Sequence, residues 1–131
     1  MNQEKIPILY NFEPITRRNQ FLGVAFALYD ANGAPINLAG ATIKMDVREK
    51  PGATAVISFS TAANTVIIET DGEQPVQNQL RLAPRTEVDM NIPGGWPLPK
   101  KYKYDIEISL AGQGVQTFFK GDFPILEDIT Q

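Results

Sequence analysis

The chain has 131 residues and a formal charge of −3, and this length suits one domain with a single hydrophobic core. It contains no cysteine and no histidine, which excludes disulfides, cysteine metal sites and the usual general base. The basic residues form no long run and no apolar run approaches the roughly 20 residues of a membrane helix, so we expect neither nucleic-acid nor membrane binding. Residues 1–5 lack the apolar core of a signal peptide, so we expect synthesis in the cytoplasm.

Residues 1–18 are predicted to form an edge strand or an arm. Their apolar side chains alternate with other residues, as in a strand, at Ile6, Ile8, Tyr10 and Phe12. Pro7 and Pro14 lie in or beside this stretch and cannot donate a ladder hydrogen bond, which favours a position at a sheet edge.

The next segment, Gln20–Tyr29, is predicted to be a strand that is apolar on both faces. One face carries Leu22, Val24, Phe26 and Leu28, and the other carries Phe21, Gly23, Ala25, Ala27 and Tyr29. Such a strand is central or covered by something else. We expect either the N-terminal arm or a neighbouring subunit to cover the second face.

Turn signals and short alternating strands fill the middle of the chain. Asp30–Pro35 has the chemistry of a tight turn, with Asn-Gly followed by proline. Four strands with one apolar face are predicted after it, at Thr42–Arg48, Ala53–Ser60, Thr65–Thr70 and Gln79–Ala83. Arg85–Met90 is predicted to form one helical turn with Thr86 as its N-cap.

The longest irregular stretch is predicted at residues 91–101, because it contains three prolines and two adjacent glycines. The only tryptophan, Trp96, and the nearby Leu98 lie in this loop. Aromatic side chains on preformed loops are typical anchors for partners. The sequence leaves open whether Trp96 is presented to a partner or folds back to close one end of the domain.

A β-hairpin closes the chain, formed by Tyr102–Leu110 and Val115–Ile125 around a Gly-rich loop. Large apolar side chains alternate with polar ones along the first of these strands. The same period along the second strand places Phe119 inward and Phe118 on the outer face. Phe118 is therefore a candidate for an exposed contact.

The pattern as a whole predicts an all-β protein. Seven or eight short strands, with turn signals at intervals of roughly 8–12 residues, are typical of a sandwich or barrel. We predict a single antiparallel β-sandwich domain over residues 1–131, immunoglobulin-like or jelly-roll-like in architecture. A hairpin with one apolar face needs a second layer to cover it.

Little in the sequence indicates catalysis, and we expect a protein that is not an enzyme and uses no cofactor or metal. Asp105 and Glu107 share one strand face at a separation that glycosidases use, but no aromatic cleft is evident beside them. The serines have no histidine to activate them and no nucleophile-elbow motif.

Association with other proteins is better supported by the residues. The candidate partner-binding side chains are Trp96, Leu98, Phe118, Phe21, Tyr29 and Tyr10. An alternative is a carbohydrate-binding module, for which Trp96, Tyr102 and Tyr104 would form a stacking platform. The alternation along the strand places the two tyrosines in the core, which weakens this alternative.

The order of turn and strand residues resembles a pattern found in phage proteins. After a polar-arginine entry at Arg18–Phe21, the chain reads "D-x-x-G-x-P-I-x-L-x-G-A-x-I" over residues 30–43. The match continues at Met45–Arg48, Tyr104–Ile108, Gly121–Ile125 and Asp128–Thr130. This pattern resembles the small β-sandwich domain of phage and prophage tail proteins, best known at the N-terminus of baseplate upper proteins.

The resemblance implies a structural component of the virion, in a tail, a baseplate or a fibre connector, with a head-associated role as an alternative. It implies no catalysis, assembly into homo-oligomers, and docking onto other tail or virion proteins. The expected location is the virion, after synthesis in the host cytoplasm.

Overall fold

A computed structural model describes residues 8–129, and every regular element in this part of the chain is a β-strand. The strands, in chain order, are β1 (Ile8–Leu9), β2 (Ile15–Thr16), β3 (Val24–Ala27), β4 (Thr42–Arg48), β5 (Ala55–Ser60), β6 (Val66–Glu69), β7 (Gln79–Leu82), β8 (Lys100–Ser109) and β9 (Val115–Leu126). The all-β prediction is confirmed for the described residues, and the arrangement is consistent with a β-sandwich.

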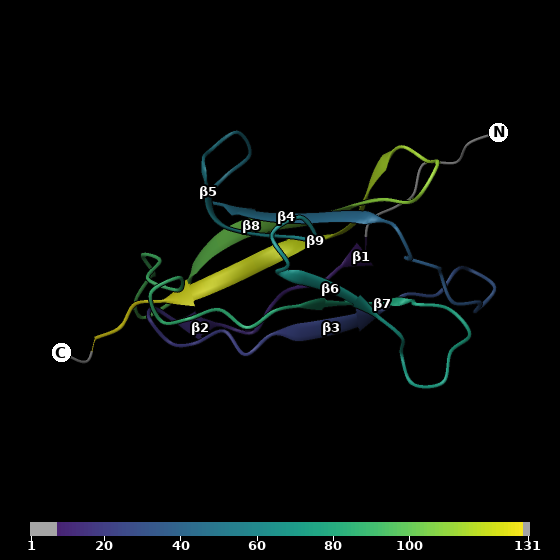
Figure 1. Ribbon diagram of the computed structural model, residues 1–131. Helices are drawn as coiled ribbons and strands as arrows, with labels where there is room; N and C mark the ends of the chain where they lie inside the picture. Colours follow the sequence, from purple (N-terminus) through teal and green to yellow (C-terminus); the bar gives the residue numbers. More distant parts are fainter. Residues whose placement is uncertain (1–7, 130–131) are drawn as a thin grey trace.

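The strands form two sheets that lie one above the other (Figure 1). The larger sheet has six strands in the order β1-β9-β8-β4-β5, and β2 also pairs with β9. The smaller sheet has three strands in the order β3-β7-β6. Its two strand pairs are antiparallel, with Phe26 opposite Leu80 and Ile68 opposite Leu80.

The prediction of seven or eight antiparallel strands is corrected at the N-terminal segment. Within residues 8–129 there are nine strands, and β1 and β2 run parallel to β9. The predicted single edge strand is divided in two, with Pro14 between the two short pairings. The expected edge position is confirmed, whereas Ile6 and Pro7 lie outside the described residues.

The hydrophobic core lies between the two sheets and follows the predicted alternation along β4 and β8. Ile43, Met45 and Val47 of β4 are completely buried. Phe12, from the segment between β1 and β2, is also in the core, with its ring centroid 4.9 Å from those of Tyr104 and Phe123. The N-terminal segment therefore contributes to the core as well as to the sheet edge.

The β8–β9 hairpin is confirmed, but the outward placement of Phe118 is wrong. The register shifts at a bulge, because Ile106 lies opposite Phe119 whereas the next residue, Glu107, lies opposite Thr117. Phe118 is the extra residue, and its side chain is only 3 % exposed. A bulge interrupts the strict two-residue period on which the sequence prediction depended.

The strand predicted over Gln20–Tyr29 is shorter than expected and changes phase at Gly23. This glycine has φ +91°, and a Cβ built on it would lie 2.7 Å from the Leu82 carbonyl oxygen. As a result Phe21 points into the core and is only 6 % exposed, whereas Leu22 is 80 % exposed. The apolar outer face of β3 is reduced to Ala25, Ala27 and Tyr29.

The predicted connections agree with the structure in their main features. The Asp30 carboxylate accepts hydrogen bonds from the N–H groups of Asn32 and Ala34, which closes the tight turn. The Thr86 hydroxyl accepts a hydrogen bond from the N–H of Asp89, as an N-cap does, over a single turn of chain. Residues 91–99 are irregular, as expected from their prolines and glycines.

Candidate partner-binding surface and charged hollow

Only three of the six sequence-predicted contact residues are exposed, and two of these share a loop. Trp96 and Leu98 are 60 % and 78 % exposed on the same loop, and Tyr29 is 42 % exposed elsewhere. Phe21 and Phe118 are buried for the reasons given above, and Tyr10 is half-buried with its ring against Phe12 and Phe26. The Trp96 ring is presented to solvent and does not close the end of the domain.

The loop that carries Trp96 is fixed to the end of β9 by main-chain hydrogen bonds. Gly95 donates its N–H to the Ile125 carbonyl at 3.0 Å, and the Glu127 N–H donates to the Gly95 carbonyl at 2.9 Å. The buried Tyr102 hydroxyl donates to the Pro93 carbonyl at 2.6 Å. The backbone on the N-terminal side of Trp96 is therefore held in place before any partner arrives.

Two adjacent glycines make this close approach possible. A Cβ on Gly94 would lie 2.5 Å from the main-chain carbon of Leu126, and one on Gly95 would lie 2.5 Å from the Leu98 carbonyl oxygen. Contacts this short involve backbone atoms that cannot turn away, so any side chain would displace the loop. The Gly-Gly pair is thus a packing requirement of the Trp96 loop.

An ion pair between Arg17 and Glu127 also contacts the base of this loop. The Arg17 guanidinium lies 3.1 Å from the Glu127 carboxylate and also donates to the Asn91 side-chain oxygen at 2.8 Å. Glu127 accepts a further hydrogen bond from the Gly94 N–H. The hydrogen bond from Arg17, with that from Gly94, lowers the pKa of Glu127 below its ordinary value. These contacts span up to 110 positions of sequence, and no local pattern predicts them.

Other large apolar side chains are exposed on the segments that meet at this end. Val88 is 83 % exposed on the turn before the loop, and Ile129 is 60 % exposed beyond Glu127. The loops lie together where the C-terminus is marked in Figure 1. We call Val88, Trp96, Leu98 and Ile129 the Trp96 end.

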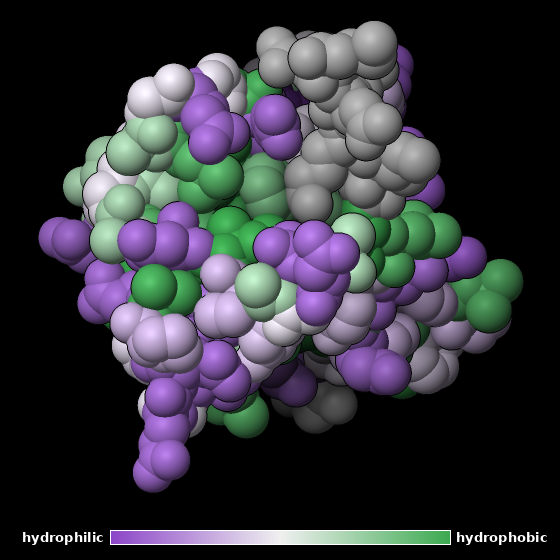
Figure 2. Space-filling view, turned by 90° about the vertical axis from the view of Figure 1, so that its right-hand side faces the viewer, coloured by the Kyte–Doolittle hydropathy of each residue, from purple (hydrophilic) through white to green (hydrophobic). Residues whose placement is uncertain are grey.

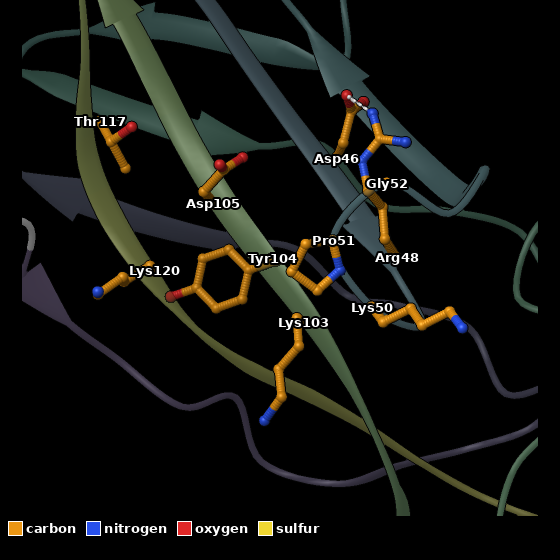
Figure 3. A pocket seen from close by; sticks show the side chains of 10 residues that line it. All are labelled: Asp46, Arg48, Lys50, Pro51, Gly52, Lys103, Tyr104, Asp105, Thr117 and Lys120. Carbon is orange, nitrogen blue, oxygen red and sulfur yellow. Dashed lines mark hydrogen bonds and ion pairs between the residues drawn. The ribbon is translucent and has the colours of Figure 1, made fainter.

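A second feature is a charged hollow of about 510 Å³ on the outer face of the larger sheet. Figure 3 shows the ten residues that line it, from β4, β8, β9 and the turn at residues 50–52. Its charged side chains are Asp46, Arg48, Lys50, Lys103, Asp105 and Lys120. All of these except Lys50 lie on the solvent-facing side of β4, β8 or β9, whose other side forms the core.

Like charges lie directly opposite each other across β4 and β8 in this hollow. The register places Asp46 opposite Asp105, and Arg48 opposite Lys103. Asp46 is well satisfied, because Arg48 lies 2.8 Å away and the Ser58 hydroxyl donates to it at 2.6 Å. Lys103 pairs instead with Asp122. Among the described residues, no ion pair within 4 Å is formed by Asp105.

The pKa values of these two carboxyl groups accordingly shift in opposite directions. Burial raises the pKa of Asp46, but the Ser58 hydrogen bond and the charges of Lys44 and Arg48 outweigh it, so its pKa is lowered. Burial and the neighbouring Asp46 charge together raise the pKa of Asp105, against the opposing effect of Arg48 and Lys44. The hollow thus contains one carboxylate that is stabilised in its charged form and one that is not.

Among the described residues, neither a group of metal ligands nor the suggested sugar-binding platform is formed. No group of three or more acidic, histidine or cysteine side chains within residues 8–129 is placed to hold a metal ion. The three-ring platform suggested for sugars is not formed, because Tyr102 and Tyr104 are only 2 % and 4 % exposed. Their hydroxyls donate to the main-chain carbonyls of Pro93 and Tyr10 inside the fold.

Comparison with models of known protein families and with curated protein sequences found no match to this chain. None of the described residues forms a helix long and apolar enough to cross a membrane.

Proposed function

We propose that the protein is a non-enzymatic structural component of a phage virion, in a tail, baseplate or fibre connector. It is a single β-sandwich domain over residues 1–131 that acts by binding neighbouring virion proteins and further copies of itself. The observation that carries the proposed binding to other proteins is Trp96, which is 60 % exposed on a loop that hydrogen bonds hold against β9.

An exposed tryptophan on a fixed loop suits an anchor for a protein partner. Tryptophan is enriched among the few residues that supply most of the binding energy at interfaces. A loop that is already ordered loses little further conformational freedom on association. Leu98, on the same loop, would add apolar area to the contact, and Val88 and Ile129 are exposed on other segments at this end.

The role in a virion is supported by the sequence pattern rather than by this geometry. The D-x-x-G-x-P-I motif at residues 30–36 and the hairpin motifs resemble the small domain of phage tail proteins. The all-β fold is compatible with that resemblance. A head-associated position remains the alternative within the same class of virion proteins.

The test is incorporation of the chain into phage particles. We expect mass spectrometry to find the chain in purified particles from the strain that encodes it, and immunogold labelling to place it on the tail. In a complemented deletion, Trp96→Ala is expected to reduce incorporation at least tenfold. Val115→Ala is the control, because Val115 is 63 % exposed at the hairpin loop, away from the Trp96 end.

Three outcomes would count against parts of this proposal. Absence of the chain from the particles would contradict a virion role. Labelling of the capsid would favour the head-associated alternative. Reproducible sugar binding on a glycan array that is lost in Trp96→Ala would favour the carbohydrate-binding alternative.

A further inference from the structure

β3 is an end strand of the smaller sheet, and its outer edge carries main-chain groups that no described residue pairs with. Leu28 continues the β3–β7 register and donates its N–H to the Asn78 carbonyl. Because main-chain groups alternate in direction along an antiparallel strand, those of Val24 and Phe26 also point to β7. The N–H and C=O groups of Ala25 and Ala27 therefore point to the free edge, where no described strand pairs with β3.

A groove of about 430 Å³ runs beside this edge, between β3 and the β1–β9 edge of the larger sheet. Nine residues line it, and none of them carries a charge. Ile8 and Tyr29, at its rim, are 48 % and 42 % exposed. In Figure 1 β3 points toward the side that Figure 2 views, where hydrophobic residues gather near the middle of the face.

The edge at β5 differs, because the chain itself occupies it. The Arg85 guanidinium donates to the Ser58 carbonyl at 2.7 Å, and Thr65 donates its N–H to the Ser60 carbonyl at 2.9 Å. Charged side chains and local contacts of this kind protect edge strands from pairing. Within residues 8–129 nothing protects β3 in this way: its exposed side chains are small, and Arg81, opposite Ala25, is neutralised by Glu69 at 2.8 Å.

We propose that two copies of the chain pair through β3, antiparallel about a twofold axis near Phe26. Ala25 of one copy would then lie opposite Ala27 of the other, so that the free donors and acceptors of both edges are matched. A second copy fits because the edge is self-complementary: it offers equal donors and acceptors and an uncharged groove. The small side chains let the two strands approach, and the two three-stranded sheets become one continuous sheet.

This inference rests on the self-association included in the proposed function, but names a surface distinct from the Trp96 end. It is tested by sedimentation equilibrium of the full chain over a wide concentration range. We expect a monomer–dimer equilibrium whose dissociation constant rises at least tenfold in Ala27→Lys and in Ala27→Pro. Proline removes only an N–H that points away from β7, so the fold, checked by circular dichroism, should persist.

Two control variants test whether the dimer forms at β3 and not elsewhere on the surface. Ile67→Lys adds the same charge at a residue that is 41 % exposed on β6, the opposite edge of the sheet, and should leave the dimer intact. Trp96→Ala should also leave it intact. A wild-type monomer at the highest concentration, or a dimer insensitive to both Ala27 variants, would overturn the inference, whereas the particle assay decides the virion role separately.

The register can be tested by cross-linking, because the native chain has no cysteine. Directly opposed residues in a hydrogen-bonded pair have Cα atoms about 5.5 Å apart, which a disulfide can span. An equimolar mixture of Ala25→Cys and Ala27→Cys should form the mixed disulfide faster than either variant alone. Faster linkage of either variant to itself would contradict the proposed register.

Discussion

At the scale of single residues, the charged hollow contains one destabilising pair of like charges. Asp105 lies opposite Asp46, and burial together with this like charge raises the Asp105 pKa. Like charges directly opposite each other in a sheet are destabilising. Ser58, Arg48 and Lys44 stabilise the ionised form of Asp46. The repulsion between the two carboxylates therefore mainly destabilises the ionised form of Asp105.

Replacing Asp105 with asparagine should therefore stabilise the protein at neutral pH, by about 0.5 kcal/mol. A folded-state pKa above the unfolded value of about 3.9 means that ionised Asp105 costs stability above the folded pKa. Below both pKa values the carboxyl is neutral in either state, and Asp105→Asn should lose its advantage. Urea unfolding at pH 7 and near pH 3 checks this, and an equal effect at both pH values would contradict it.

Gly94 and Gly95 provide a second prediction at this scale. Gly95→Ala should destabilise the protein by about 1–3 kcal/mol, because the added methyl group meets main-chain atoms that cannot move freely. Gly114→Ala is the matched control, since a Cβ there meets nothing within 4 Å and its φ is not in the left-handed region. Urea unfolding should show little or no loss of stability for the control. Equal losses in the two variants would show that the Trp96 loop is not tightly clamped.

At the scale of elements, local irregularities decide which side chains reach the core. The alternation along Thr42–Arg48 predicts the inward residues of β4, because the strand has a regular face toward the core. The same reasoning fails at Phe118 and Phe21, where a bulge and a positive-φ glycine each shift the phase. Both shifts depend on pairing with a distant strand, which the local sequence does not contain.

The bulge in β9 can be tested through Phe118 itself. Phe118→Ala should cost about 3–5 kcal/mol, as expected for a buried phenylalanine, whereas on a regular strand the ring would be exposed and its loss nearly neutral. Val115→Ala on the same strand, at an exposed position, should change the free energy of unfolding by less than about 0.5 kcal/mol. A small effect of Phe118→Ala in chemical denaturation would contradict the bulge and indicate that Phe118 is exposed on a regular strand.

The candidate site was predictable in part for similar reasons. Its prolines and glycines identify residues 91–101 as a loop, and the single tryptophan draws attention to Trp96. The exposure of the indole was not predictable, since it depends on the anchoring of Gly95 to β9 and on the Arg17–Glu127 ion pair. Those contacts join three remote segments that share no local pattern.

At the scale of the whole molecule, the two proposed interaction surfaces use different parts of the fold. The Trp96 end consists of loops beside the C-terminal end of β9, whereas the free edge of β3 offers main-chain groups and an uncharged groove. A chain with two such surfaces can pair with a copy of itself through one and bind a different protein through the other. That combination is what assembly into a larger particle requires.

Because Trp96 is the only tryptophan and lies at just one of these surfaces, its fluorescence can separate them. Indole emission shifts to shorter wavelength when the ring leaves water. We expect native emission close to that of the unfolded chain, no shift when the protein dimerises through β3, and a blue shift when the Trp96 end binds a different protein. Acrylamide quenching should likewise be strong in both monomer and dimer. A blue shift that follows the monomer–dimer equilibrium would place the self-association at the Trp96 end and contradict the assignment of separate roles.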